Sequence, residues 1–544
     1  MIHLTNITRQ HGKQILFKNA GFQILPGTRT GLVGPNGSGK TTIFRLITGE
    51  EHADGGDISY PKKTKIGYFS QDVGGMSGRS ALEEVMYASE DVMRLGEEIG
   101  EMEAAMGQPL DDDEMAALLK RYGDAQEQFE RRGGYDLESR AQTVLTGLGI
   151  GPDEYGRPVE SFSGGWKMRI ALAKILTLNP DVLLLDEPTN HLDVESIIWL
   201  EDWLVSEFKG ALLMTCHDHD FMNRIVSRII EVANQALTTY NGDYDFYLRE
   251  REVRREQLQA SYRRQQEMLA KEEAFIARFA ARASHASQVQ SRIKKLDKIT
   301  RIELPPEQRI IKFTFNEPPR SGDDVAVIDD LGKTWPLPEV GSKSIFSGVS
   351  GIIRRQDKIA VVGVNGAGKS TFLKVLAGRA EPTSGSIRMG TNLAPGYFSQ
   401  HAMDILNPAR TVLETVQDAI PLETLGVVRS LCAAFLFQGD AVDKRISLLS
   451  GGEKSRLVLA TLLARPLNLL ILDEPTNHLD IRSREILLEA LLKFTGTVVL
   501  VSHDRHFLRS LVGRVFEIDH GEMLIYEGGY EYYLGKTARG PHAA

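Results

Sequence analysis

Cysteine is nearly absent from this chain, and long hydrophobic runs are absent altogether. Only Cys216 and Cys432 occur in 544 residues, which excludes a disulfide framework and a cysteine-ligated metal or iron–sulfur centre. The first residues, MIHLTNITRQHGKQ, lack the apolar core of a signal peptide. No run approaches the ~20 apolar residues of a membrane span. The sequence therefore predicts a cytoplasmic protein in a reducing compartment, with no membrane partner.

The charge is unevenly distributed along the chain. Hydrophobic residues make up 42% and charged residues 25%, which is ordinary for a globular protein, and the net charge is -9. Between Arg249 and Arg301, however, 14 Lys/Arg stand against 7 Asp/Glu. An acidic body of two or more domains thus carries a basic insert, and a local basic patch suits an anionic partner.

The chain contains a tandem duplication. GPNGSGKTT, which begins at Gly34, recurs as GVNGAGKST at Gly363, and LLLDEPTNHLD at Leu183 recurs as LILDEPTNHLD at Leu470. Between and after them, YFSQ recurs unchanged, FSGGW recurs as LSGGE, and CHD recurs as SHD, all in the same order. Two copies of one unit are therefore predicted.

One interval differs between the copies. Lys40 to Ser163 spans 123 residues, whereas Lys369 to Ser450 spans 81. The extra residues fall at about 80–132, where apolar residues recur at helical spacing and QPLDDDE supplies a turn and an N-cap. We predict a helical arm there, which is acidic and suits a basic protein partner.

These observations predict an α/β fold with two tandem P-loop units. The predicted boundaries are 1–248 for the first unit including the arm, 249–305 for a basic helical hairpin linker, 306–538 for the second unit and 539–544 for a tail.

Each copy has a phosphate-binding loop between an apolar strand-like run and a helical run. Glycines let backbone N–H groups surround phosphate oxygens, Lys40 or Lys369 reaches the β and γ phosphates, and Thr41 or Ser370 can ligate Mg²⁺. The predicted phosphate-binding residues are Gly34, Pro35, Asn36, Gly37, Ser38, Gly39, Lys40, Thr41 and Thr42, and Gly363, Val364, Asn365, Gly366, Ala367, Gly368, Lys369, Ser370 and Thr371.

Acidic residues follow two further apolar runs, DVLLLDE and LNLLILDE. Such runs are typical of buried parallel strands, which deliver carboxylates to the sheet edge where ligands bind. We expect the first acid to hold Mg²⁺ and the second to orient and polarise an attacking water. A glutamine could complete the metal shell, and a histidine could sense the γ-phosphate. The expected metal ligands are Asp186, Asp473, Gln71 and Gln400 beside the two hydroxyls, and the expected catalytic residues are Glu187, Glu474, His217 and His503.

In order and spacing, these motifs resemble those of ATP-binding cassette ATPases over almost the whole chain. The resemblance implies D-loops at His191 to Asp193 and His478 to Asp480. It also implies head-to-tail cassettes, in which each ATP lies between the Walker A loop of one and the signature of the other. The implied signature residues are Ser163, Gly164 and Gly165 for the ATP on Lys369, and Ser450, Gly451 and Gly452 for the ATP on Lys40. His11 and Trp335 occupy the position of the adenine-stacking aromatic, although both depart from the usual tyrosine.

Within that superfamily the chain is similar to the ABC-F subfamily. The shared features are two cassettes in one chain, DEPTNHLD in both, an arm in the first, a charged linker, and FSGGW with Trp166 in place of glutamine or glutamate. The resemblance implies a monomer with paired cassettes that binds ATP, Mg²⁺ and the ribosome. The linker would lie near the P-site tRNA, rRNA and the peptidyl transferase centre, and the arm near a ribosomal protein. Some members confer antibiotic resistance.

The linker itself predicts an RNA-binding hairpin. Phe275 and Phe279, then Val289, Ile293 and Leu296, have helical spacing and could form an apolar seam between two helices. Lys and Arg contacts to phosphates bring affinity with little sequence reading. The predicted RNA-binding residues are Arg278, Arg282, Arg292, Lys294, Lys295 and Lys298.

We therefore expect an ATPase that binds the ribosome in its ATP-closed state and leaves on hydrolysis. Two alternatives remain open at this point. One is the ATPase subunit of a membrane transporter, which would have no use for a basic hairpin. The other is a DNA-repair type ABC ATPase, which usually carries longer coiled coils or zinc modules.

Overall fold

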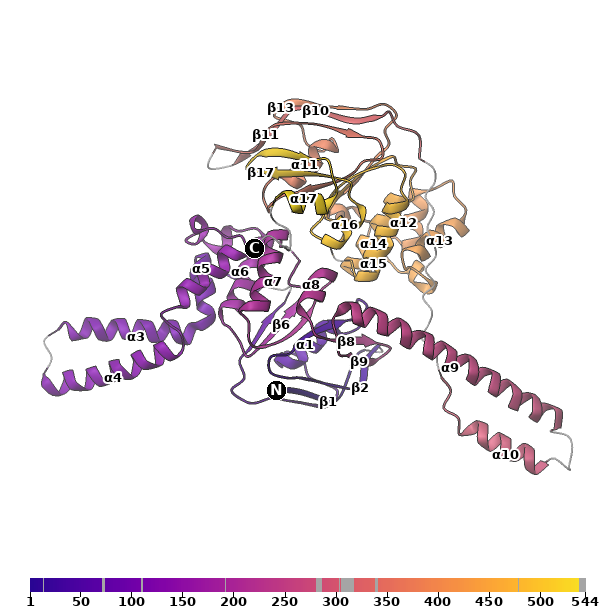
Figure 1. Cartoon of the computed structure of the whole chain (residues 1–544), viewed down its shortest axis with the longest axis horizontal. Helices are drawn as coiled ribbons and strands as arrows, with labels where there is room; N and C mark the ends of the chain where they lie inside the picture. Colours follow the sequence, from indigo (N-terminus) through magenta and orange to yellow (C-terminus); the bar gives the residue numbers. More distant parts are fainter. Residues whose placement is uncertain are drawn as a thin grey trace.

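The fold is that of two α/β cassettes, seen in a computed structural model. The structure describes residues 1–12, 14–70, 74–108, 111–190, 192–279, 286–302, 304, 318–337, 341–477 and 479–537. Cassette 1, coloured indigo to magenta, lies below cassette 2, coloured orange to yellow (Figure 1). Two helical hairpins leave the body of cassette 1 on opposite sides. The fold class expected from the sequence is confirmed.

A six-stranded sheet forms the centre of cassette 1, with the order β5-β6-β7-β3-β8-β9. The first five strands run parallel, and β9 pairs antiparallel with β8. Strands such as β6 are buried along their whole length, as their unbroken apolar sequence predicts. The strands are β3 (Arg29–Val33), β5 (Ile66–Phe69), β6 (Val182–Asp186), β7 (Ala211–Thr215), β8 (Arg228–Ala233) and β9 (Ala236–Tyr240).

Cassette 2 repeats this sheet with the order β14-β15-β16-β12-β17-β18. The duplication read from the motifs therefore extends to the strand order, and it places both glycine-rich loops and both acidic pairs at equivalent sheet edges. The strands are β12 (Lys358–Val362), β14 (Pro395–Phe398), β15 (Leu469–Asp473), β16 (Thr497–Val501), β17 (Arg514–Asp519) and β18 (Glu522–Tyr526).

A three-stranded antiparallel sheet covers one face of each cassette, in the orders β2-β1-β4 and β11-β10-β13. In cassette 1 the helix α1 (Lys40–Thr48) packs between the two sheets, because Ile43, Phe44 and Ile47 share one buried cluster with both. In cassette 2, α11 (Lys369–Leu376) takes this place. The strands are β1 (Ile2–His11), β2 (Gln14–Ile24), β4 (Gly55–Ser59), β10 (Asp324–Leu337), β11 (Gly341–Arg354) and β13 (Ser384–Met389).

Helices cover the opposite face of each central sheet and form the larger apolar cluster of each cassette. In cassette 1 they are α2 (Ala81–Met86), α5 (Leu137–Gly147), α6 (Gly164–Thr177), α7 (Val194–Ser206) and α8 (His219–Ile225). In cassette 2 they are α12 (Val412–Ala419), α13 (Leu425–Ala434), α14 (Gly451–Leu463), α15 (Ile481–Lys493), α16 (Arg505–Leu511) and α17 (Tyr530–Lys536).

The predicted helical arm is confirmed as the hairpin of α3 (Glu90–Met106) and α4 (Asp112–Arg131). A small apolar cluster that includes Ile99, Met102 and Ala125 joins the two helices. The side chain of Asp111 caps α4 by accepting a hydrogen bond from a backbone N–H, as the acidic run predicted. The arm projects away from both cassettes (Figure 1).

The linker is the hairpin of α9 (Tyr244–Phe279) and α10 (Ala286–Asp297). At 1.5 Å per residue, α9 is about 54 Å long and starts inside cassette 1. Val289 is buried against α9, but Ile293 is 40% exposed, so its place in the predicted seam was wrong. A helix with a single neighbour buries only a narrow stripe, and Ile293 lies beside that stripe.

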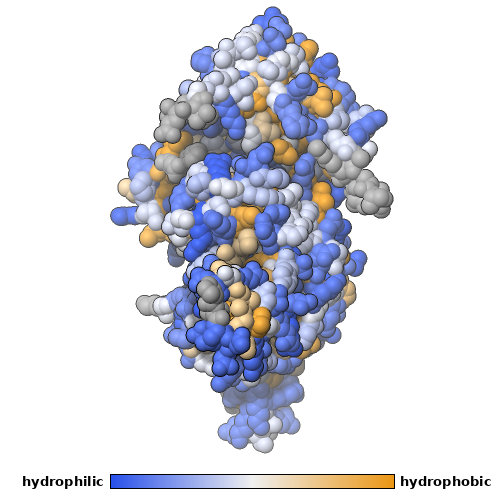
Figure 2. Space-filling view, turned by 90° about the vertical axis from the view of Figure 1, so that its left-hand side faces the viewer, coloured by the Kyte–Doolittle hydropathy of each residue, from blue (hydrophilic) through white to orange (hydrophobic). Residues whose placement is uncertain are grey.

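The surface seen from the side of the arm is mainly hydrophilic, with small scattered hydrophobic patches (Figure 2). Among the described residues, no helix combines the length and the hydrophobicity that a membrane crossing requires.

Candidate active sites

Both glycine-rich loops depend on glycine for their close approach to the sheet. Gly34 has φ 156° and Gly363 has φ 142°. A Cβ atom at either position would collide with a backbone carbonyl oxygen, that of Val232 in cassette 1 and that of Ile518 in cassette 2. Only glycine fits there, so each loop can turn its N–H groups inward at the start of α1 or α11.

The Walker A lysines lie inside their own loops. Lys40 Nζ donates hydrogen bonds to the carbonyl oxygens of Gly34 and Pro35, at 2.8 and 3.1 Å. Lys369 Nζ does the same with Gly363 and Val364, at 2.8 and 3.1 Å. Burial lowers the pKa of both lysines, against the effect of nearby carboxylates. A buried ammonium held by neutral carbonyls is a ready partner for phosphate oxygens.

The residues expected to hold a metal ion meet in both cassettes. Thr41 Oγ1 donates a hydrogen bond to Asp186 Oδ2 at 2.8 Å, and Ser370 Oγ donates to Asp473 Oδ1 at 3.0 Å. Hydroxyl and carboxylate oxygens are the hard ligands that Mg²⁺ prefers, so the donor set fits this ion. Gln71 and the side chain of Gln400 lie outside the described residues.

The expected catalytic glutamates and histidines also pair identically. His217 Nε2 lies 3.2 Å from Glu187 Oε1, and His503 Nε2 lies 3.2 Å from Glu474 Oε1. Both glutamates have left-handed backbone conformations, with φ 55° and 51°. Such strain in a non-glycine residue is uncommon and clusters at functional sites. It lets each chain leave its strand directly after the aspartate and present the next carboxylate at the sheet edge.

Burial controls the charge of these pairs. It raises the pKa of Glu187 to about 7 and that of Glu474 to about 8, and the Walker A lysines oppose this shift. Burial also lowers the pKa of His503 to about 3 and that of His217 well below its usual value. The backbone N–H groups of His217 and His503 also oppose the rise in the pKa of the two glutamates. A carboxyl group whose pKa lies near neutrality is suited to accept a proton from water.

The signature serines begin the helices α6 and α14. Ser450 accepts a hydrogen bond from the Glu453 N–H and forms a full capping box with it. Ser163 lies at the same helix position, but Trp166 replaces the glutamate, and within the described residues its hydroxyl makes no capping bond. Gly164 and Gly165, and likewise Gly451 and Gly452, form the first turns of these helices.

The two cassettes meet at these motifs. The backbone N–H of Asn365, in the Walker A loop of cassette 2, donates a hydrogen bond to Asp193 in the D-loop of cassette 1 at 3.2 Å. A cavity of about 960 Å³ at this junction is lined by Trp166, Asp193, Val364 and Asn365, among others. His191 and His478 lie outside the described residues. One cassette's signature helix therefore shares a cavity with the other's phosphate-binding loop.

Comparison with known proteins decides the family. A family model described as ABC transporter matches residues 17–190 and 346–477, and a second model with this description matches 230–315. The chain is 36% identical to the "Probable ATP-binding protein YheS" of Haemophilus influenzae, over 98% of this chain and 81% of that protein. It is 34% identical to "ABC transporter F family member 2" of Arabidopsis thaliana, over 98% and 79%.

The chain belongs to the ABC-F family. The "Putative ATP-binding protein YdiF" of Bacillus subtilis is a further relative, 35% identical over 98% of this chain and 83% of that protein. ABC cassettes bind and hydrolyse ATP, so this ABC-F protein is an ATP hydrolase. Among solved structures, "RNase-L Inhibitor" matches with a TM-score of 0.62 at 18% identity, covering 98% of this chain and 92% of that one. This likeness shows the tandem-cassette fold.

The adenine-stacking candidates lie at equivalent places in the two antiparallel sheets of this ABC-F protein. Trp335 Nε1 is 3.5 Å from Thr371 Oγ1, and its side chain is 38% exposed beside the Walker A helix. His11, at the end of β1, is half exposed and lies 3.9 Å from Glu51. Trp335 therefore lies next to its phosphate-binding loop, with the Lys333 ammonium 4.3 Å from the centre of its ring.

Several arginines that bridge the cassettes did not emerge from the motif search. Arg484, Arg505 and Arg509 of this ABC-F protein all contact residues of cassette 1. Aligning the two copies could have revealed these arginines. The second copy has LDIRSRE where the first has LDVESII, and it has HDRHFLR where the first has HDHDFMN. The excess of arginine in one copy marks the contact surface.

Proposed function

We propose that this ABC-F ATPase binds the ribosome in its ATP-closed state and dissociates on hydrolysis. The observation that carries the proposal is the linker hairpin, because α9 is one continuous helix that starts in cassette 1 and carries the basic helix α10 away from the body (Figure 1). A rigid helix transmits a change of cassette orientation to its tip. Two solved structures of this fold bear the titles "complex of archaeal ribosomal stalk protein aP1 and archaeal ribosome recycling factor aABCE1" and "Model of ribosome-bound archaeal Pelota and ABCE1".

The exposed cations of the hairpin would contact rRNA and the P-site tRNA near the peptidyl transferase centre. Lys294 and Lys295 are exposed on α10, and Lys298 is exposed directly after its last residue. Arg292 instead pairs with Glu272 at 2.5 Å and covers the ring of Phe275, so it stiffens the hairpin. Arg278 lies near the end of α9, and Arg282 lies outside the described residues. Lys295 also lies 3.4 Å from Glu272, so Lys294 and Lys298 are the stronger candidates for phosphate contacts.

Each nucleotide site would use the residues that the structure brings together. The Walker A loops and lysines would bind the phosphates of ATP, and the opposite signature serines, Ser163 and Ser450, would approach the γ-phosphate. Mg²⁺ would be held by the hydroxyl and aspartate of each cassette and would neutralise phosphate charge. Glu187 and Glu474 would orient and polarise the attacking water and accept its proton, and His217 and His503 would sense the γ-phosphate.

A direct path links the sensor histidine of cassette 1 to the linker. Asp218 follows His217 and caps α8. From α8, His219 Nε2 contacts Asp245 Oδ1 of α9 at 2.8 Å, and Asn223 donates a hydrogen bond to the other oxygen at 2.9 Å. Because α8 contacts the base of α9, closure at the site would turn the base of the hairpin.

ATP must supply the energy for this closure. Moving the population from mostly open to mostly closed needs about 5 kcal/mol of differential ATP affinity.

The test is cosedimentation with ribosomes in a sucrose gradient. The double variant E187Q/E474Q should comigrate with ribosomes in ATP, because it closes on ATP without hydrolysing it. The matched variant K40A/K369A, which loses phosphate binding, should remain at the top of the gradient. If the double glutamine variant also stays at the top, the ribosome assignment is wrong.

The two alternatives make different predictions. Reversing the charge of Lys294, Lys295 and Lys298 should abolish ribosome cosedimentation and leave basal ATP hydrolysis intact. A transporter subunit would not cosediment with ribosomes before or after this change. Duplex DNA should compete poorly against ribosome binding, whereas a DNA-repair ATPase would show the reverse preference. We also assign the acidic arm, α3 and α4, to a basic ribosomal protein.

A further inference from the structure

A side chain of cassette 2 holds the backbone at the sensor histidine of cassette 1. Arg484, on α15, donates hydrogen bonds from Nη1 to the carbonyl oxygen of His217 at 3.2 Å and to Asp504 Oδ2 at 3.0 Å. Its Nε donates to the carbonyl oxygen of Leu479 at 3.1 Å. The guanidinium is largely buried, with 12% exposure, so these bonds replace bonds to water. Arg484 therefore joins the D-loop end of one cassette to the sensor loop of the other.

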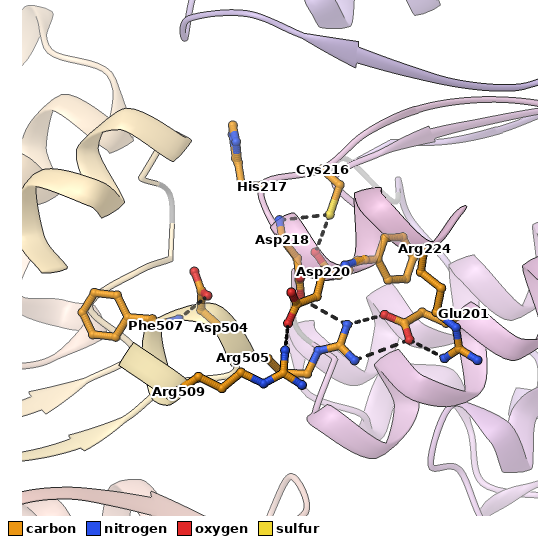
Figure 3. A network of polar contacts seen from close by, with 12 residues as sticks. Glu201, Cys216, His217, Asp218, Asp220, Arg224, Asp504, Arg505, Phe507 and Arg509 are labelled. Atoms are coloured by element: carbon orange, nitrogen blue, oxygen red, sulfur yellow. Dashed lines mark hydrogen bonds and ion pairs between the residues drawn. The ribbon is translucent and has the colours of Figure 1, made fainter. Parts of the chain in front are cut away.

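Two more arginines of cassette 2 hold the helix that follows this loop. Arg505 lies between Glu201 of α7 and Asp218, and Arg509 pairs with Asp220 (Figure 3). Glu201 is 1% exposed and Arg505 8%. Because both ends of the contact are buried, α8 is held against cassette 2 by more than surface charge.

Only cassette 2 has these arginines at the corresponding sequence positions. Four residues after Asp480 the chain has Arg484, but four residues after Asp193 it has Ile197, which is apolar and buried in the core of cassette 1. The residues of cassette 1 that correspond to Arg505 and Arg509 are His219 and Asn223, and both bind α9 instead. Cassette 2 therefore has the arginines, and cassette 1 has the link to the linker.

We propose that Arg484 is a positioning residue for ATP hydrolysis at the nucleotide site on Lys40. By fixing the carbonyl of His217, it keeps the imidazole at its 3.2 Å distance from Glu187. The proposal rests on the catalytic roles proposed above for Glu187 and His217. It makes the two sites unequal, because hydrolysis at the first site depends on a side chain from cassette 2 that has an apolar counterpart at the second.

The loss of Arg484 should slow hydrolysis because catalytic sites tolerate little displacement of their side chains. A backbone carbonyl that loses a buried charged donor moves toward water or a new donor, and the attached imidazole moves with it. Displacement of a reacting group by about 1 Å can cost up to a hundredfold in rate. Phosphate and adenine contacts do not involve this carbonyl, so ATP binding should be preserved.

The experiment measures each site separately in the full chain. In the E474Q background only the site on Lys40 turns over, and in the E187Q background only the site on Lys369. Introducing R484M should lower kcat about tenfold in the first background. It should leave KM for ATP in both backgrounds within about twofold. The loss of kcat should be smaller in the second background, where Arg484 bonds the side chain of Asp504, next to His503, and not the backbone of the sensor histidine itself. R484K, which keeps one donor and the charge, should recover part of the lost kcat.

A control variant and the contrary outcomes make the test specific. K493M removes a cation from the exposed end of the same helix, where Lys493 lies 3.6 Å from Glu489, and it should change neither rate. If R484M slows both backgrounds equally, or neither, Arg484 has no site-specific role and the inference is overturned. If instead the E187Q/E474Q double variant hydrolyses ATP at the wild-type rate, the catalytic assignments fail first, and the inference fails with them.

Discussion

Replacing Arg505 with methionine should destabilise the contact between the cassettes by about 2–4 kcal/mol. Removing one partner of a buried ion pair leaves the other charge uncompensated, which typically costs about 3–5 kcal/mol. Here Glu201 would remain 1% exposed without its inter-cassette partner (Figure 3). It would keep Arg224, a half-exposed arginine, at 2.8 Å, so we expect a cost somewhat smaller than the typical one.

The structure also predicts how the loss can be reversed. The carboxylates of Asp218 and Glu201 raise the pKa of Arg505 although burial works to lower it, so the charge is held by both. Replacing the pair by two apolar side chains of similar volume is often neutral. The double variant E201M/R505M should therefore be more stable than R505M alone, and the interaction energy from the cycle should be about 1.5–3 kcal/mol.

Equilibrium unfolding in urea provides the assay. Trp199 and Trp203 lie on α7 on either side of Glu201, so tryptophan fluorescence reports on the helix that holds the pair. R224M is the matched control, because an exposed partner should contribute only about 0–1 kcal/mol. An interaction energy between Glu201 and Arg505 below about 0.5 kcal/mol would refute the reasoning, since it would mean that the pair is hydrated in solution.

Three further predictions concern pH, salt and ATP. Burial raises the pKa of Asp218 to about 6, against the effect of Arg505. The native state therefore keeps a proton that the unfolded state releases, and the free energy of unfolding falls as pH rises toward 6. In urea titrations, the free energy of unfolding of D218N relative to wild type should increase by about 1 kcal/mol between pH 5 and pH 7.5. K294E/K298E should reduce the slope of log K for ribosome binding against log salt by about 1–2, whereas an unchanged slope would place these lysines away from RNA. W335A in the E187Q background should raise KM for ATP about tenfold in steady-state assays, and an unaltered KM would exclude stacking on adenine.

The parts of this protein that local sequence determines were predictable. A strand, a glycine-rich loop and a helix follow each other within a few residues, so Lys40, Thr41 and their counterparts could be placed before the fold was known. The arm was predictable because the second copy shows which residues of the first copy are extra. The helices from Glu90 to Arg131 occupy the interval in which the first copy is longer.

The contacts between distant segments were not predictable from local patterns. Glu272 lies 20 residues before Arg292 in the chain, yet it pairs with Arg292 and contacts Lys295 across the hairpin. Ile293 has helical spacing with Val289 but stays 40% exposed, whereas Val289 is buried. The same holds for the arginines of cassette 2, whose partners depend on how two whole domains pack.

The most direct test of the proposed function is a cryo-EM map of ribosomes incubated with the E187Q/E474Q variant and ATP. The account predicts density for both cassettes closed on two nucleotides, with α9 and α10 against RNA beside the tRNA and the peptidyl transferase centre, and with Lys294 and Lys298 at phosphates. A map in which the protein is bound with the hairpin in solvent, or in which ribosomes carry no such density, would contradict it.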